Sequence, residues 1–183
     1  MFDIETAGQY RNIEELKIND IRGYNLFSQK YIKYNWVDKY ETLEKAYLEE
    51  SPIISTYGRI TCISFGYLDN GIERVSSFYG DDEKDIVEKF NNLLKKIETK
   101  NFKLGGYRIL YFDIPWILHK LHKYGIKPVN IITLHNKKPW ETRIVDISDD
   151  WKIRFAYTSS FDEVTYELGI ESPKDNMNGS DVH

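Results

Sequence analysis

Two carboxylates at the start of the chain have a spacing that suits metal chemistry. The first six residues read Met-Phe-Asp-Ile-Glu-Thr, with acidic side chains at Asp3 and Glu5. In a β-strand, residues two apart share a face, and their Cα atoms lie about 6.5–7 Å apart. Mg²⁺ and Mn²⁺ prefer oxygen ligands, and a two-metal phosphodiester hydrolase holds its ions roughly 3.5–4 Å apart with several carboxylates. Asp3 and Glu5 are therefore candidate ligands, although a chain with 29 acidic residues also contains such a triplet by chance.

Asp113 is the third candidate carboxylate. It stands in Phe112-Asp113-Ile114-Pro115-Trp116, at the start of an apolar pattern with helical spacing. Asp is a favoured N-cap residue and Pro suits the first turn, so helix capping is one interpretation of this motif. The other interpretation is a metal ligand brought close to the first strand by the fold.

Composition restricts the classes of partner. The single cysteine, Cys62, excludes a disulfide within the chain and a zinc site built from several thiolates. The net charge of −4 implies that any contact with nucleic acid is local and not spread over a basic surface. No apolar run approaches the roughly 18 residues of a membrane span, and no secretion signal is recognisable. We expect a cytoplasmic protein without a membrane partner.

The middle of the chain predicts a hairpin followed by a helix. Residues 59–68 and 72–79 are rich in β-branched and aromatic side chains and flank Asp69-Asn70-Gly71, which favours a tight turn. Three acidic residues at 81–83 then precede an apolar stripe that reaches Ile97 with helical period.

Shorter elements are predicted on either side. We expect a strand over 102–110, a helix from Ile114 that stops at Gly125, a strand over 143–147 and a helix over 161–168 that ends at Gly169. Before the hairpin, 41–50 favours a helix halted before Pro52, and the rest of 9–50 is an aromatic-rich excursion. The order of elements predicts an α/β fold.

This ordered set resembles the DEDD (DnaQ-like) 3′–5′ exonucleases of the ribonuclease H-like superfamily. It is most similar to the predicted exonucleases related to the proofreading domain of family B DNA polymerases. The motifs that carry the resemblance are Asp-Ile-Glu-Thr at 3–6 and Phe-Asp-Ile-Pro at 112–115. Supporting stretches are Gly-Asp-Asp-Glu-Lys at 80–84, Lys-Pro-Trp-Glu at 138–141, Leu-Gly-Ile-Glu-Ser-Pro-Lys at 168–174 and Gly-Ser-Asp-Val at 179–182.

The resemblance implies a fold, a reaction and a set of site residues. The fold would be a single ribonuclease H-like domain over 1–183, with a mixed sheet made of a central β-hairpin or meander plus parallel strands and flanked by helices. Asp3, Glu5 and Asp113 would be catalytic and would bind Mg²⁺ or Mn²⁺ in a two-metal site. The substrate would be the 3′ end of single-stranded DNA, and the product a nucleoside 5′-monophosphate. Thr6, Phe112 and Arg108 would lie next to the nucleic acid.

Three departures from the family pattern qualify these expectations. The second motif has Gly106-Tyr107-Arg108 where the family has Gly-His-Asn, so a cation replaces an amide. No third motif, Tyr-x3-Asp or His-x4-Asp, follows Asp113. Only two residues precede Asp3, fewer than a buried central strand usually has. We therefore expect a domain incomplete at both ends, with a metal site that is only partly filled.

Two other functions are compatible with the same residues. A degenerate ribonuclease H-like module could keep the fold and bind nucleic acid or protein without cleaving, as the change at Arg108 and the absent third motif suggest. A structural or interaction domain would leave Asp3 and Glu5 as ordinary surface acids. The histidines His119 and His122, three residues apart, lack further ligands at matching spacing and are expected to be surface or packing residues.

Overall fold

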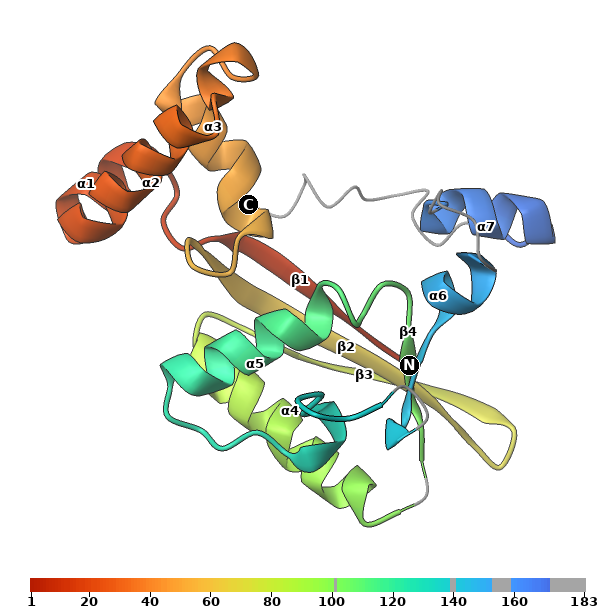
Figure 1. Ribbon diagram of the computed structural model, residues 1–183. Helices are drawn as coiled ribbons and strands as arrows, with labels where there is room; N and C mark the ends of the chain where they lie inside the picture. Colours follow the sequence, from red (N-terminus) through yellow and green to blue (C-terminus); the bar gives the residue numbers. More distant parts are fainter. Residues whose placement is uncertain (101, 139–140, 153–158, 172–183) are drawn as a thin grey trace. The chain divides into compact units, whose positions relative to one another are not determined.

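The computed structural model describes residues 1–100, 102–138, 141–152 and 159–171, and the chain forms two compact units. The first unit comprises Met1–Ile4 and the described part of Cys62–Asn178, and the second comprises Glu5–Thr61. Strands β1 (Phe2–Gly8) and β2 (Gly58–Asp69) each run through both units. Figure 1 shows the elements in sequence colours.

A three-stranded antiparallel sheet with the order β1-β2-β3 carries the first motif. Strand β3 (Ile72–Tyr79) pairs antiparallel with β2, and the turn between them places Asn70 at φ 52° and Gly71 at φ 81°. Two consecutive residues with positive φ are what a tight hairpin turn requires, and Asn-Gly supplies them with little strain. The predicted hairpin is confirmed.

The pairing of β1 with β2 determines which edge of β1 has backbone groups that β2 does not bind; this is the open edge of β1. Met1 donates to the Gly66 carbonyl at 2.7 Å, and the Gly66 N–H donates to the Met1 carbonyl at 2.9 Å. Because hydrogen-bonding direction alternates along a strand, the N–H of Ile4 points to the opposite edge. The second motif contacts this open edge of β1.

A second, two-stranded sheet pairs β4 (Leu104–Gly106) in parallel with β5 (Ile144–Asp146). A Cβ added at Gly106 would lie 2.8 Å from the Phe2 carbonyl oxygen and 2.3 Å from Ile109 Cγ2, so β4 lies close to β1 and no larger residue fits there. The predicted strand over 102–110 is too long. The strand ends at Gly106 because the following residues turn, with Arg108 at φ 58°.

Two amphipathic helices complete the core of the first unit. Helix α4 (Glu83–Glu98) starts at the cap Asp82, whose side chain accepts the Asp85 N–H, and α5 (Asp113–Lys123) ends before Gly125 at φ 66°. Their apolar faces are buried, and the ring of Phe90 lies 5.2 Å from that of Phe2 on β1. Both predicted helices are confirmed, and Figure 1 shows them on the same face of the sheet.

The remaining elements of the first unit are short. They are η3 (Asn130–Ile132), α6 (Ile147–Lys152) and α7 (Phe161–Leu168). Helix α7 has a capping box, in which the side chains of Ser160 and Glu163 each accept the other residue's backbone N–H, and Gly169 closes it at φ 66°. The helix predicted over 161–168 is confirmed, and the strand predicted over 143–147 is shortened to β5.

The second unit is helical and has an aromatic core. It contains α1 (Ile13–Asn19), α2 (Ile21–Lys33), η1 (Trp36–Asp38), α3 (Leu43–Glu50) and η2 (Ser51–Ile53). The fully buried ring of Phe27 meets the rings of Tyr47 and Tyr57 edge-on, at 5.2 and 5.0 Å. The helix predicted over 41–50 is confirmed as α3, whereas α1 and α2 were not predicted.

At the level of fold class, the prediction of an α/β protein is confirmed. The described residues form one antiparallel and one parallel sheet together with helices. Among these residues, none of the helices combines the length and the apolar character needed to cross a membrane.

Candidate carboxylate site

Asp113 connects the second motif to the first. Helix α5 begins at Asp113, and its N-cap residue is Phe112, which makes no side-chain capping bond. The Asp113 side chain is 3% exposed, and its Oδ1 accepts the N–H of Ile4 at 2.9 Å, across 109 positions of sequence. Asp113 therefore binds the open edge of β1. It is not the N-cap of α5 but a contact between the strand and the helix.

The surroundings of Asp113 disfavour its negative charge. Burial, and after it the negative charge of Asp3, raise the pKa of Asp113 to about 7, and the hydrogen bond from Ile4 opposes this rise only in part. Two carboxyl groups within electrostatic reach of each other, one of them without access to water, resist ionising together. A cation placed between them would remove this repulsion.

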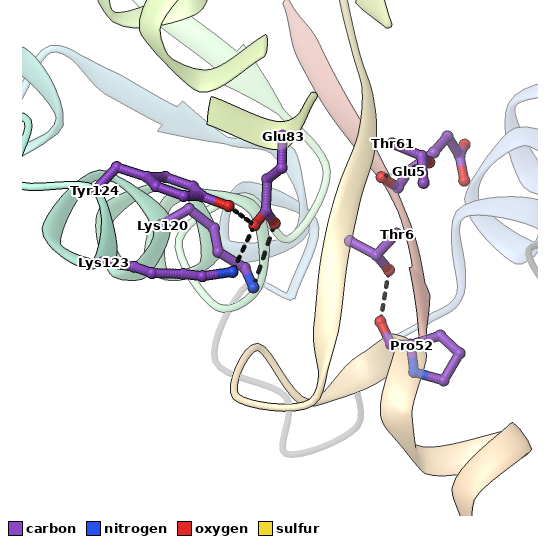
Figure 2. A network of polar contacts seen from close by, with 8 residues as sticks. All are labelled: Glu5, Thr6, Pro52, Thr61, Glu83, Lys120, Lys123 and Tyr124. Carbon is purple, nitrogen blue, oxygen red and sulfur yellow. Dashed lines mark hydrogen bonds and ion pairs between the residues drawn. The ribbon is translucent and has the colours of Figure 1, made fainter. Parts of the chain in front are cut away.

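The alternation of side chains along β1 exposes Asp3, as the sequence predicts. Phe2 and Ile4 are buried on β1, whereas Asp3 and Glu5 are exposed. Asp3 belongs to the same unit as Asp113 and contributes to its electrostatic environment. The backbone carbonyl of Glu5 accepts the hydroxyl of Thr61 at 3.1 Å in the second unit (Figure 2).

Thr6 has a structural contact that the sequence did not predict. It is buried, and its hydroxyl donates to the Pro52 carbonyl at 2.5 Å (Figure 2). This bond ties the second half of β1 to η2 within the second unit. A role of Thr6 in nucleic-acid binding stays a prediction.

Asp146 holds the loop that leads to Asp113. This residue ends β5 and is 4% exposed. Its Oδ1 accepts the Arg108 N–H at 2.8 Å, and its Oδ2 accepts the Leu110 N–H at 3.0 Å. The backbone N–H and the hydroxyl of Ser148 also donate to Oδ1, at 3.0 and 2.7 Å. These four donors engage both oxygens, so Asp146 is a structural anchor and not a natural metal ligand.

Sequence analysis did not assign this role to Asp146. The available signal was Asp-x-Ser at the end of a predicted strand, a pattern in which the acidic side chain accepts the N–H two residues on. The long-range bonds to 108 and 110 carry no local signal. They fix Arg108 in a left-handed conformation that residues with a Cβ rarely adopt.

The two other predicted contact residues lie on or beside this loop. The side chain of Arg108 is exposed, and the backbone N–H of this residue donates the hydrogen bond to Asp146. The half-buried ring of Phe112 packs against Trp116 at 5.6 Å between centroids. Tyr111, 61% exposed, donates its hydroxyl to Asp149 at 2.9 Å.

A buried ion pair joins helix α5 to helix α4. Glu83 contacts the ammonium groups of Lys120 at 3.2 Å and Lys123 at 3.0 Å, and it accepts the Tyr124 hydroxyl at 2.6 Å (Figure 2). The side chains of Glu83 and Lys120 are 5% and 3% exposed, and burial lowers the pKa of Lys120. This network joins the start of α4 to the end of α5, and sequence analysis missed it because its partners lie about 40 residues apart along the chain.

The donor set decides what cation the site can take. Asp3 and Asp113 offer carboxylate oxygens, and Mg²⁺ is commonly bound by one or two carboxylates, several waters and substrate phosphates. Within the described residues, no group of three or more His, Cys, Asp or Glu side chains is arranged to hold a metal ion. The residues present suit one weakly held divalent cation better than two tightly held ones.

Parts of the predicted motifs lie outside the described residues. These are Pro139 and Trp140 of the 138–141 stretch, the end of the 168–174 stretch from 172 onward, and the whole of 179–182. Comparison of the chain with protein-family models, with curated proteins and with solved structures finds no match.

Proposed function

We propose that this chain is the metal-dependent 3′–5′ exonuclease domain of a cytoplasmic protein and hydrolyses single-stranded DNA from its 3′ end. The observation that carries the proposal is the coupling of Asp113 to Asp3 and Ile4. Two motifs 109 residues apart in sequence meet through a hydrogen bond of 2.9 Å and a shared electrostatic environment. A structural helix start would need neither a buried carboxylate nor a second one nearby.

The close approach of β4 to β1 supports the finer fold assignment. A ribonuclease H-like sheet would place β4 beside β1, and the contact at Gly106 brings the two strands to that distance. The proposal treats the three-stranded and two-stranded sheets as parts of one mixed sheet. Asp113 then lies at the junction between these parts.

The proposed roles follow from the positions of the side chains. Asp3 and Asp113, both in the first unit, would hold a Mg²⁺ or Mn²⁺ ion. A role of Glu5 as a ligand stays a prediction from the resemblance. Such an ion supplies an activated water and neutralises charge on the phosphate. Phe112 and Arg108 would contact the terminal nucleotide.

The experiment is a ladder assay on a 5′-labelled single-stranded oligonucleotide with Mn²⁺. We expect slow shortening from the 3′ end, lost in Asp3→Ala and in Asp113→Ala. Asp150→Ala is the matched control, because Asp150 is an exposed acid on α6, and it should retain the activity. Shortening that persists in Asp3→Ala would come from a contaminant and would remove the support for this proposal.

The second candidate is a ribonuclease H-like module that binds nucleic acid without cleaving it. The exposed guanidinium of Arg108 favours it, since a fixed cation beside the loop can hold a phosphate where catalysis needs a metal. In that case the oligonucleotide remains intact with every variant, yet Arg108→Ala weakens its binding. Intact DNA together with unchanged binding in Arg108→Ala would exclude both candidates.

A further inference from the structure

An open hollow of the first unit lies away from the carboxylates. It has a volume of about 650 Å³, within the range of small-ligand sites. One wall is the outer side of α5, where Leu118 and His122 are four residues apart and so share a face. The other wall is the segment after α5, which includes η3.

The walls of this hollow are held in place by buried hydrogen bonds. The side-chain amide of Asn91, on α4, donates to the Lys127 carbonyl at 3.1 Å and accepts the Val129 N–H at 3.2 Å. The Ile126 N–H closes the end of α5 by donating to the Leu121 carbonyl at 2.8 Å. Asn91 is fully buried, so the hollow is formed without a ligand and needs little ordering to receive one.

The lining combines an apolar surface with basic side chains. Leu118, Pro128 and Leu134 are apolar residues of the lining, and its titratable side chains are His122, Lys127 and His135. Among the residues that the structure describes, no carboxylate lines the hollow, although acidic residues outnumber Lys and Arg in the chain. The chemistry therefore suits an anion that carries an apolar or planar body.

We infer that this hollow binds a nucleoside monophosphate. The ammonium of Lys127 and the imidazole N–H groups of His122 and His135 are three separate donors, and a phosphate monoester offers three acceptor oxygens, whereas a carboxylate offers two. The nucleobase of this ligand has a planar face that can pack on the side chains of Leu118 and Leu134. Leu118 and His122 follow Asp113 by five and nine positions, about 7–14 Å along the helix axis, so the hollow is separate from the carboxylate site. The inference therefore does not depend on the proposed nuclease function.

Calorimetric titration of the whole chain in EDTA tests this inference with dAMP, deoxyadenosine, inorganic phosphate and benzoate. We expect dAMP to bind at least ten times more tightly than each of the other three. Lys127→Ala and His135→Gln should each weaken dAMP binding by a factor of about ten, with unchanged circular dichroism. Both side chains are exposed, so neither change disturbs the core.

Two control variants separate this site from the rest of the protein. Lys96→Ala removes an exposed lysine of α4 outside the hollow, and Asp113→Asn alters the carboxylate site; both should bind dAMP as the unmodified chain does. Equal affinity for phosphate and dAMP would refute the role of the apolar wall. Tighter binding of benzoate would refute the phosphate assignment, and an effect of Lys96→Ala equal to that of Lys127→Ala would place binding elsewhere.

Discussion

At the scale of single residues, Asp113 stands out because the fold buries it near another acid. Its carboxyl group is 3% exposed and its pKa is about 7, against 3.8 for an aspartate in water. The folded protein therefore binds the Asp113 proton more tightly than the unfolded chain does. Between about pH 4 and pH 7, stability should fall as the pH rises, because only the folded state still holds this proton. Below this window the contribution is constant, and above it the penalty of the buried charge is fully present.

Asp113→Asn tests this pH dependence. The amide oxygen can still accept the Ile4 N–H, but no charge forms. We expect the free energy of unfolding in EDTA at pH 8 to rise by roughly 1–3 kcal/mol, since one pKa unit corresponds to about 1.4 kcal/mol. Between pH 5 and 8 the dependence of stability on pH should become flatter. Asp150→Asn, on the exposed side of α6, should change neither quantity. An unchanged pH dependence in Asp113→Asn would mean that the residue is ionised throughout.

Asp146→Asn tests the anchor of the loop. An amide has one acceptor oxygen, so its NH₂ group would face either the Leu110 N–H or the donors of Arg108 and Ser148. A buried donor without a partner costs about 1–3 kcal/mol, and we expect urea unfolding to show a loss of this size. Asp149→Asn, which affects only the exposed hydroxyl of Tyr111, should lose less than about 0.5 kcal/mol. Equal losses in the two variants would contradict the anchoring role.

At the scale of elements, the buried ion pair fixes α4 against α5. Glu83→Gln leaves the ammonium of Lys120 buried without its counter-charge, and such losses amount to about 3–5 kcal/mol. Glu83→Gln combined with Lys120→Met removes both charges, and it should recover much of the stability. The exposed pair Lys89–Asp85 on the same helix α4 is the control, because Asp85→Asn there should cost about 0.5 kcal/mol or less. A double variant no more stable than Glu83→Gln alone would show that the pair is not coupled.

The elements also show what local sequence can predict. The hairpin and the helices α4, α5 and α7 were predicted because Asn70-Gly71, Asp82, Gly125 and Gly169 are local signals at their ends. The strand over 102–110 was predicted too long, since its end depends on a carboxylate 36–38 residues further along the chain. Helices α1 and α2 were missed although Asn12 and Asp20 cap them, because the whole segment was interpreted as an aromatic-rich excursion.

The candidate site also has some features that local sequence predicts and others that depend on long-range contacts. Alternation along β1 identifies Asp3 and Glu5 as exposed, and the second motif singles out Asp113. Three contacts are long-range: the bond from Ile4 to Asp113, the anchor at Asp146 and the ion pair at Glu83. The residues that make them are of common types for their local positions, so the local sequence gives no signal of these contacts. Only the packing of strand against helix brings them together.

At the scale of the whole molecule, charge sets the expected mode of nucleic-acid binding. The chain has 29 acidic and 25 Lys or Arg residues, for a net charge of −4. A protein with this balance releases few counterions when it binds DNA, whereas one that neutralises many phosphates loses affinity steeply as salt increases. Binding should therefore depend on local contacts and on a divalent cation more than on the overall field of the protein.

Salt titration of single-stranded DNA binding measures this directly. For the unmodified chain with Mn²⁺, we expect log K against log salt to have a slope between about −1 and −2, since each neutralised phosphate of a single strand contributes roughly −0.7. Arg108→Ala should make the slope shallower by about 0.7, because its exposed guanidinium is a direct phosphate contact in both candidate functions. Asp3→Ala should weaken binding only when the divalent cation is present, since the acid acts through the metal. Lys96→Ala is the control and should leave slope and affinity unchanged. A slope steeper than about −4 would show that the chain binds DNA through an extended basic surface, contrary to its charge balance.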